Sequence, residues 1–352
     1  MTLLSCCSAL AVLTLLPAPR PLVAQRTVAN FDRGWRFHLG DVSGGEKLAF
    51  DDSGWRTLDL PHDWSIEGEF SDTNPAGAHG GALPGGVGWY RKTFAVAQRD
   101  AGRRVFVEFD GVYRNSEVWI NGQYLGKRPY GYSSFRYELT QHLRYGRKRN
   151  VIAVRVDNSQ QPNSRWYSGS GIYRHVRLVT MHPVHVDQWG TYITTPEAST
   201  DSARVTIRTR IRSASQADEP ITLRTTLFDA AGTEVATAAS DGRMSGDSVT
   251  EMAQDLIIRN PTLWSIDRPY LYRAVSRLTC QRKPCDEYTT PFGVRTFSFD
   301  VERGFTLNGR ALKIRGVCLH HDLGALGAAV NTRALERQLE VMKAMGVNAI
   351  RT

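Results

Sequence analysis

The feature that most constrains the fold is a change of sequence period close to residue 299. From about residue 31 to residue 292, apolar residues alternate with polar ones or form short β-branched runs, as in ARVTIRTRIRS and NVIAVRVDN. After residue 299, apolar residues recur at helical spacing from about Thr332, and Gly346 marks the end of that run. A long portion without helical periodicity, followed by a helix, predicts a mainly β chain with a domain of another class after it.

The β portion divides into two predicted domains. Residues 26–182 read as short strands separated by turn signals, with a hairpin at Asn121-Gly122, and this pattern favours a jelly roll. Residues 184–292 alternate apolar and polar residues over about 110 positions, the size and texture of an immunoglobulin-like β-sandwich.

The segment 299–352 reads as a hairpin and strand, a loop, a helix and a second strand that begins at Val347. This order predicts a βαβ unit with two parallel strands. Because one such unit cannot bury both of its faces, we expect it to be the start of a larger parallel sheet or barrel.

Charge and hydropathy exclude two classes of partner. The chain has 44 Lys and Arg against 35 Asp and Glu, a formal charge of +9, but the basic residues are scattered singly and form no patch typical of nucleic-acid binding. No segment after the N-terminus is apolar over the roughly 20 residues that a membrane span needs. We therefore expect neither a nucleic-acid partner nor a membrane span.

The first residues resemble a secretory signal peptide. Leu3 to Leu16 are apolar and uncharged, and small residues precede a cleavage position near Ala24. We therefore predict that residues 1–24 are a signal peptide and that the protein is exported to the periplasm or secreted.

Export bears on the cysteines. Cys280 and Cys285 face each other across a predicted hairpin, so they form either a disulfide or two free thiols on an exposed turn. The sequence has no Cys or His spacing that is typical of a metal site.

Several long stretches resemble glycoside hydrolase family 2, in its secreted bacterial β-galactosidase branch. They include FDDSGWRTLDLPHDWSIEG, NPAGAHGGALPGGVGWYRKTF, FDGVYRNSEVWINGQYLG, SQQPNSRWYSGSGIYRHVRL and RGVCLHHDLGALGAAV with LEVMKAMGVNAIRT. The resemblance implies a jelly-roll sugar-binding domain, an immunoglobulin-like domain and then a catalytic (β/α)8, or TIM, barrel that begins in residues 299–352.

The same resemblance implies retaining hydrolysis of terminal β-D-galactosides by two carboxyl groups about 5–5.5 Å apart. In the family the acid/base Glu follows an Asn at the fourth barrel strand, and the nucleophilic Glu lies on a later strand. We expect both to lie beyond Thr352, so that this chain carries no catalytic residue and is inactive by itself.

Two residues of the barrel segment match family positions that contact the substrate. His320, just past the first barrel strand, matches a His that hydrogen-bonds galactose hydroxyls; the alternative is a loop His with no special role. Arg351, at the end of the second strand, matches an Arg that orients the nucleophilic carboxylate; the alternative is a surface salt bridge.

Two residues of the jelly roll match further sugar contacts. Asn74 matches a loop Asn that touches galactose, and Asp157 matches an Asp near the C6 hydroxyl and a bound cation, Mg²⁺ or Na⁺. The alternative for both is turn chemistry. The chain lacks the longer acidic insert of well-known members after Asp157, which counts against the cation. Trp166 and Tyr167 are predicted to pack between jelly roll and barrel rather than to stack on sugar.

Other functions stay open on the sequence. β-Glucuronidase and β-mannosidase share this domain order, and a jelly roll with a sandwich is also typical of a carbohydrate-binding or adhesion module without catalysis. The expected partner is a β-galactoside oligosaccharide or glycan. The resemblance is also compatible with a homo-oligomer.

Overall fold

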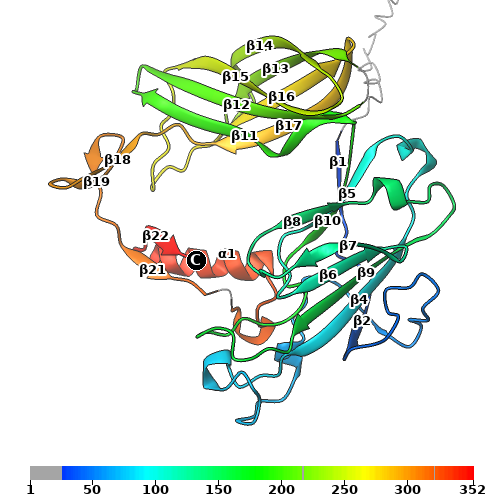
Figure 1. The fold of residues 1–352 in the computed structure, drawn as a ribbon. Helices are drawn as coiled ribbons and strands as arrows, with labels where there is room; N and C mark the ends of the chain where they lie inside the picture. The colour runs from blue at the N-terminus through cyan, green and yellow to red at the C-terminus, as the bar shows by residue number, and fades with distance from the viewer. Residues whose placement is uncertain (1–25, 216–217, 321) are drawn as a thin grey trace, which may run out of the picture.

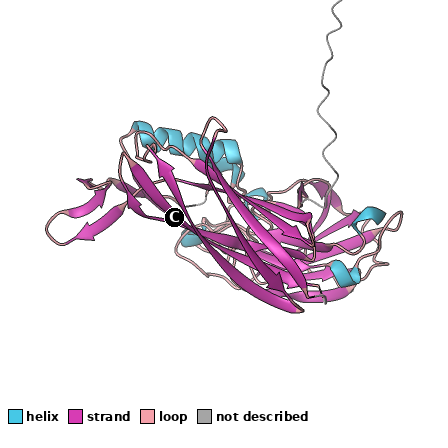
Figure 2. Ribbon diagram, turned by 90° about the horizontal axis from the view of Figure 1, so that it is seen from above, coloured by secondary structure: helices cyan, strands magenta, loops and turns pink. Residues whose placement is uncertain are grey.

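The computed structural model describes residues 26–215, 218–320 and 322–352. The predicted signal peptide, residues 1–24, lies outside the described residues. Strands dominate the fold, and α1 (Thr332–Ala344) is its long helix (Figures 1 and 2). No helix in the described ranges is long and apolar enough to cross a membrane. The prediction of a mainly β chain is confirmed.

The first domain is a sandwich of two antiparallel sheets. One sheet has the order β3-β2-β4-β9-β6-β7 and the other has the order β1-β10-β5-β8. The bounds of these strands are β1 (Thr27–Asn30), β2 (Trp35–Leu39), β3 (Arg56–Leu58), β4 (Gly86–Phe94), β5 (Arg104–Phe109), β6 (Ser116–Ile120), β7 (Gln123–Arg128), β8 (Phe135–Glu138), β9 (Asn150–Asn158) and β10 (Val176–Met181). Short 3₁₀ turns are η1 (Ser65–Glu67), η2 (Ala78–Gly80), η3 (Gln98–Asp100) and η4 (Thr140–His142).

Aromatic and β-branched residues on the inner faces of these sheets form the core of the first domain. Trp35, Tyr90, Phe109 and Ile152 are all 0% exposed. At the predicted hairpin, Asn121 and Gly122 have φ of 51° and 84°, the left-handed pair that a tight turn between β6 and β7 requires.

The second domain is a sandwich of a three-stranded sheet, β11-β12-β15, and a four-stranded sheet, β14-β13-β16-β17. The strands are β11 (Val184–Ala198), β12 (Ser202–Ala214), β13 (Glu219–Phe228), β14 (Glu234–Met244), β15 (Asp247–Arg259), β16 (Tyr272–Cys280) and β17 (Lys283–Phe292). Buried and exposed residues alternate along β12, because one face of the sheet covers the core and the other meets solvent.

The chain then leaves the second sandwich through a small protruding sheet and returns to the first domain (Figure 1). The protruding sheet consists of β18 (Phe297–Asp300), β19 (Gly304–Leu307) and β20 (Arg310–Ala311). The chain then continues through β21 (Gly316–Cys318), η5 (Gly324–Leu326), α1 and β22 (Ala349–Arg351). The strands β21 and β22 pair in parallel, so the predicted βαβ unit is confirmed. Asn331 caps α1 by accepting a hydrogen bond from the Ala334 amide at 3.1 Å.

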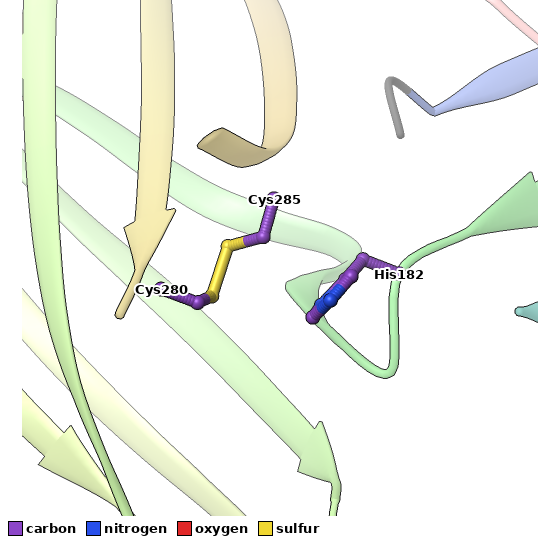
Figure 3. A group of neighbouring side chains, drawn as sticks. All are labelled: His182, Cys280 and Cys285. Atoms are coloured by element: carbon purple, nitrogen blue, oxygen red, sulfur yellow. A yellow bond between two sulfur atoms is a disulfide. The ribbon is translucent and has the colours of Figure 1, made fainter. Parts of the chain in front are cut away.

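Of the two alternatives left open for the cysteines, the structure contains the disulfide between Cys280 and Cys285 at the β16–β17 turn (Figure 3). His182 lies beside it, and these three residues are the one group of potential metal ligands among the described residues. Because both sulfur atoms are in the disulfide, neither is a thiolate that could bind a metal ion.

Buried ionic contacts join the two sandwiches. Arg26 pairs with Asp286 at 2.8 Å, and Arg136 pairs with Asp187 at 2.8 Å. His185, on β11, lies in this interface with its ring 6.3 Å from that of Phe106. Its Nδ1 donates to the His182 carbonyl at 2.8 Å, while its buried Nε2 has no hydrogen-bond partner among the described residues.

The interface should weaken in mild acid because of His185. Burial lowers the pKa of His185 from 6.5 to about 4, so the folded state excludes a proton that the unfolded state binds below pH 6.5. The free energy of unfolding should therefore fall by about 3 kcal/mol on this account as the pH drops from above 6.5 through 4.

Urea unfolding at pH 7, 5.5 and 4 checks this expectation. His185→Asn keeps a donor toward the His182 carbonyl but does not titrate, so it should flatten the pH dependence. His79→Asn, at an exposed histidine of η2, should leave the dependence unchanged. An identical pH dependence in His185→Asn and the unmodified chain contradicts the assignment.

Candidate functional site

A cavity of about 850 Å³ lies where the βαβ unit meets the first domain. Loops of the first sandwich form one wall, and β21, β22, α1 and the loop between β21 and α1 form the other. The lining residues are Tyr130, Tyr132, Trp166, Tyr173, Arg174, Cys318, Leu319, His320, Leu323, Val330, Leu335, Gln338, Arg351 and Thr352.

Two of the predicted site residues meet in this cavity. His320 follows β21, and Arg351 ends β22. The parallel register pairs Cys318 with Arg351, and the Leu319 amide donates to the Arg351 carbonyl at 2.9 Å. The C-terminal ends of two adjacent parallel strands thus present a histidine and an arginine to one cavity, the end at which barrel enzymes carry their active sites.

The facing wall is aromatic. The indole Nε1 of Trp166 donates to the Tyr132 hydroxyl at 3.0 Å, and its ring lies 5.8 Å from the His320 ring at an angle of 58°. Burial raises the pKa of Tyr173 to about 12, and its hydroxyl donates to the Gly131 carbonyl at 3.0 Å. Flat apolar rings with polar edges suit the faces and hydroxyls of a sugar.

Trp166 and Tyr167 were predicted to pack between the jelly roll and the barrel segment, and only Tyr167 is used for packing alone. Tyr167 turns inward, and its hydroxyl donates to the buried carboxylate of Asp63. Trp166 also lies between the first domain and the barrel segment, but it is 39% exposed and lines the cavity. No sequence pattern marks Trp166, Tyr132 or Arg174 as site residues, because aromatic residues in a β domain most often belong to a core and a single arginine has no characteristic spacing.

The charge of the cavity is positive. Arg174 and Arg351 line it together with His320, and none of its lining residues in the described part of the chain is acidic. Among the described residues, the lining of this cavity therefore offers groups suited to a sugar, but no pair of carboxyl groups that could cleave a glycosidic bond.

Asn74 does not line this cavity. Its side-chain amide donates to the carbonyls of Glu69 at 3.0 Å and Ala82 at 2.8 Å, which closes the loop around η2. The structure thus gives Asn74 the turn chemistry that was its alternative, and sugar contact by Asn74 remains a prediction.

Asp157, on β9, also lies outside the lining of the cavity. Its Oδ1 accepts from the Ser159 hydroxyl at 2.6 Å and the Ser159 amide at 3.1 Å, and its Oδ2 lies 3.4 Å from Arg155 Nη1. Burial raises the pKa of Asp157, but the hydrogen bonds from Ser159 and the Arg155 charge outweigh it and lower the pKa overall.

This environment does not fit the predicted Mg²⁺ or Na⁺. The Arg155 guanidinium already occupies the space beside the carboxylate, and it pairs as well with Asp41 at 2.7 Å and with Glu117 at 3.5 Å. A cation would have to displace a fixed positive charge to reach Asp157. No group of three or more candidate ligands in the described ranges includes Asp157.

Most of the chain matches models of one protein family. Residues 79–182 match the sugar binding domain of glycosyl hydrolases family 2, residues 184–295 match glycosyl hydrolases family 2, and residues 300–352 match its TIM barrel domain.

Individual relatives agree with these matches. A β-galactosidase of Bacteroides ovatus is 54% identical over 94% of this chain and 39% of its own length, and a putative β-glucuronidase of Formosa agariphila is 41% identical over 93% of this chain and 31% of its own. A crystal structure of a family 2 member from Bacteroides cellulosilyticus superposes with a TM-score of 0.89 at 41% identity, covering 92% of this chain and 42% of that one.

The chain thus spans between 31% and 42% of the lengths of these relatives. The three matched family domains follow one another in the order of the sandwich, the second sandwich and the βαβ unit, and the chain belongs to glycosyl hydrolase family 2.

Proposed function

We propose that this chain is the sugar-binding and barrel-entry part of an exported β-galactosidase. The observation that carries the proposal is the 54% identity, over 94% of the chain, to a β-galactosidase of Bacteroides ovatus. The cavity that unites His320 and Arg351 with an aromatic wall supports it, because it supplies binding groups at the strand ends where a barrel holds its substrate.

In this proposal the chain contributes binding and orientation, and a complete barrel contributes the two carboxyl groups. The His320 imidazole donates to or accepts from a galactose hydroxyl. Arg351, with its fixed and always-charged fork, orients the nucleophilic carboxylate. Trp166 and Tyr132 bind an apolar sugar face and exclude water from one side of the cavity.

β-Glucuronidase is a second candidate, and one feature of the cavity favours it. Arg174 and Arg351, with no acidic side chain among the described lining residues, would attract the carboxylate of a glucuronide. A relative named as a putative β-glucuronidase is 41% identical to this chain.

Hydrolysis of nitrophenyl β-D-galactoside, β-D-glucuronide and β-D-mannoside tests these alternatives in a protein that carries this chain followed by a complete barrel. We expect kcat/KM for the galactoside to exceed the other two by about 100-fold or more, because a site built for one polar group leaves its partners unpaired with another. A preference for the glucuronide overturns the galactosidase proposal. Sugar binding without turnover of any of the three identifies a binding module instead.

Export is part of the same proposal. The apolar leader from Leu3 to Leu16 and the Cys280–Cys285 disulfide both suit an oxidising compartment. Fractionation of a producing cell, with N-terminal sequencing of the exported protein, tests it: an N-terminus near Gln25 is expected, and a cytosolic protein that retains residues 1–24 contradicts it.

A further inference from the structure

A buried carboxylate joins the first domain to the loop that carries His320. Asp63, in the segment between β3 and η1, is 2% exposed. Its Oδ1 accepts hydrogen bonds from the amides of Ser65 at 3.0 Å and Ser170 at 2.8 Å. Its Oδ2 accepts from the Tyr167 hydroxyl and, across 265 positions of sequence, from the Ala328 amide at 2.8 Å.

The two oxygens therefore have different sets of partners. Oδ1 is bound within the first domain, whereas Oδ2 is shared between Tyr167 of that domain and Ala328 of the loop between β21 and α1. Asp63 forms no ion pair with any Lys, Arg or His of the described ranges, so four neutral donors stabilise its charge. A buried carboxylate without a cation is unfavourable unless its hydrogen bonds are complete.

The loop between β21 and α1 is also closely packed against the first domain. Ala328 is 0% exposed, and the Val330 amide donates to the Tyr173 carbonyl at 2.9 Å. Gly327 has φ of 59°, and a Cβ at that position would collide with Asp63 Oδ2 and approach the Tyr167 hydroxyl to 3.0 Å. The contact between the carboxylate and the loop thus depends on a residue without a side chain.

We infer that Asp63 is a positioning residue, which fixes the loop segment from Asp322 to Asn331 against the first domain and so sets the place of His320 in the cavity. This inference rests on the proposed function for its catalytic consequence only. The sugar-binding domain then takes part in catalysis by holding a barrel loop, in addition to lining the cavity.

The substitution Asp63→Asn removes the hydrogen bond to the loop while it keeps the hydrogen bonds within the first domain. The Asn carbonyl can still accept from Ser65 and Ser170, but its NH₂ group then faces the Ala328 amide, and two donors cannot bond each other. The Tyr167 hydroxyl can rotate to accept from the NH₂ group, so Ala328 is the donor that loses its partner. The variant should therefore release the loop while the first domain keeps its own hydrogen bonds.

Hydrogen exchange on the chain itself tests this step without any catalytic activity. In peptides that cover residues 323–331, Asp63→Asn should raise the exchange rate at least about tenfold, and Tyr167→Phe should raise it by a smaller factor. The matched control is Asp32→Asn, which alters another buried carboxylate, 5% exposed, that accepts from the Val176 amide at 2.7 Å within the first domain. Asp32→Asn should leave exchange in these peptides within about twofold. Unchanged exchange in Asp63→Asn, with a folded chain, overturns the inference.

A double-mutant cycle in a protein with a complete barrel tests the catalytic step. Asp63→Asn should lower kcat/KM about tenfold in the unmodified background and less than about twofold in the His320→Ala background, because both changes remove the same positioned contact. A tenfold loss in both backgrounds overturns the role through His320. If that protein cleaves no glycoside, the proposed function fails, while the exchange result still decides whether Asp63 holds the loop.

Discussion

Replacing Arg91 with methionine is expected to lower the free energy of unfolding of the first domain by about 3–5 kcal/mol, the range for breaking a buried ion pair. Arg91, on β4, is 1% exposed. Its Nε donates to Asp52 Oδ2 at 2.8 Å, and its other nitrogens donate to the carbonyls of Gly45, Lys47 and Phe50. Methionine fills a similar volume but leaves these acceptors without their donor.

The position of those carbonyls explains the size of the effect. They belong to one loop that folds over the outer face of the six-stranded sheet, and Arg91 is its common hydrogen-bond partner. Phe50, which lies under the guanidinium with 5.3 Å between Cζ and the ring centre, packs there with Trp55 and Trp89. Loss of the arginine therefore loosens both the backbone of the loop and the apolar cluster that the loop covers.

Thermal unfolding measures the effect, with two matched variants for comparison. Asp52→Asn should lower the free energy of unfolding by only about 1 kcal/mol, because the carbonyl bonds remain. Arg208→Met removes an exposed arginine that pairs with Glu251 at 3.9 Å, and should change it by less than about 0.5 kcal/mol. A midpoint for Arg91→Met that equals that of Arg208→Met contradicts the assignment.

Local sequence patterns were sufficient to predict several elements of this fold. Alternation along a strand reports which face is buried, so β12 is recognisable from its residues alone. Asn308-Gly309, like the earlier Asn-Gly pair, adopts the left-handed backbone of a tight hairpin, with φ of 51° and 75°. The parallel pairing of β21 with β22 follows from the helix between them.

The candidate site could be predicted only in part, because it depends on which loops meet. His320 and Arg351 come together since parallel neighbouring strands place their ends at one edge, a rule that sequence order makes available. The contact of Asp63 with Ala328 joins residues 265 positions apart, and no periodicity connects them. Its only local sign was a family-like stretch, LPHDWSIEG, in which the aspartate could as well have been a turn residue.

Asp157 shows the opposite case, in which the local sequence already contained the simpler interpretation. A serine two residues after an aspartate offers its amide and hydroxyl to the carboxylate, and Ser159 does so here. What the sequence did not reveal was Arg155, which lies two positions earlier on the same face of β9 and brings its positive charge beside the carboxylate. That charge, rather than the turn, argues against a cation.

The largest functional effect is expected from His320→Ala in a protein with a complete barrel. His320 is exposed at the cavity, its ring contacts that of Trp166, and it follows the end of β21 rather than lying in a packed core. His320 should bond a sugar hydroxyl more strongly as the sugar ring flattens toward the oxocarbenium state. Its loss should therefore remove about 2–4 kcal/mol of transition-state stabilisation, which lowers kcat/KM roughly 30- to 1,000-fold.

Stability separates this role from a structural one. Because an exposed loop residue adds little to packing, the melting temperature of His320→Ala should stay within about 2 °C of the unmodified protein. His79→Ala, at another exposed histidine that does not line the cavity, should leave both quantities unchanged. A lowered melting temperature with normal kcat/KM would remove His320 from the site, and the aromatic wall would then supply the sugar contacts of the cavity.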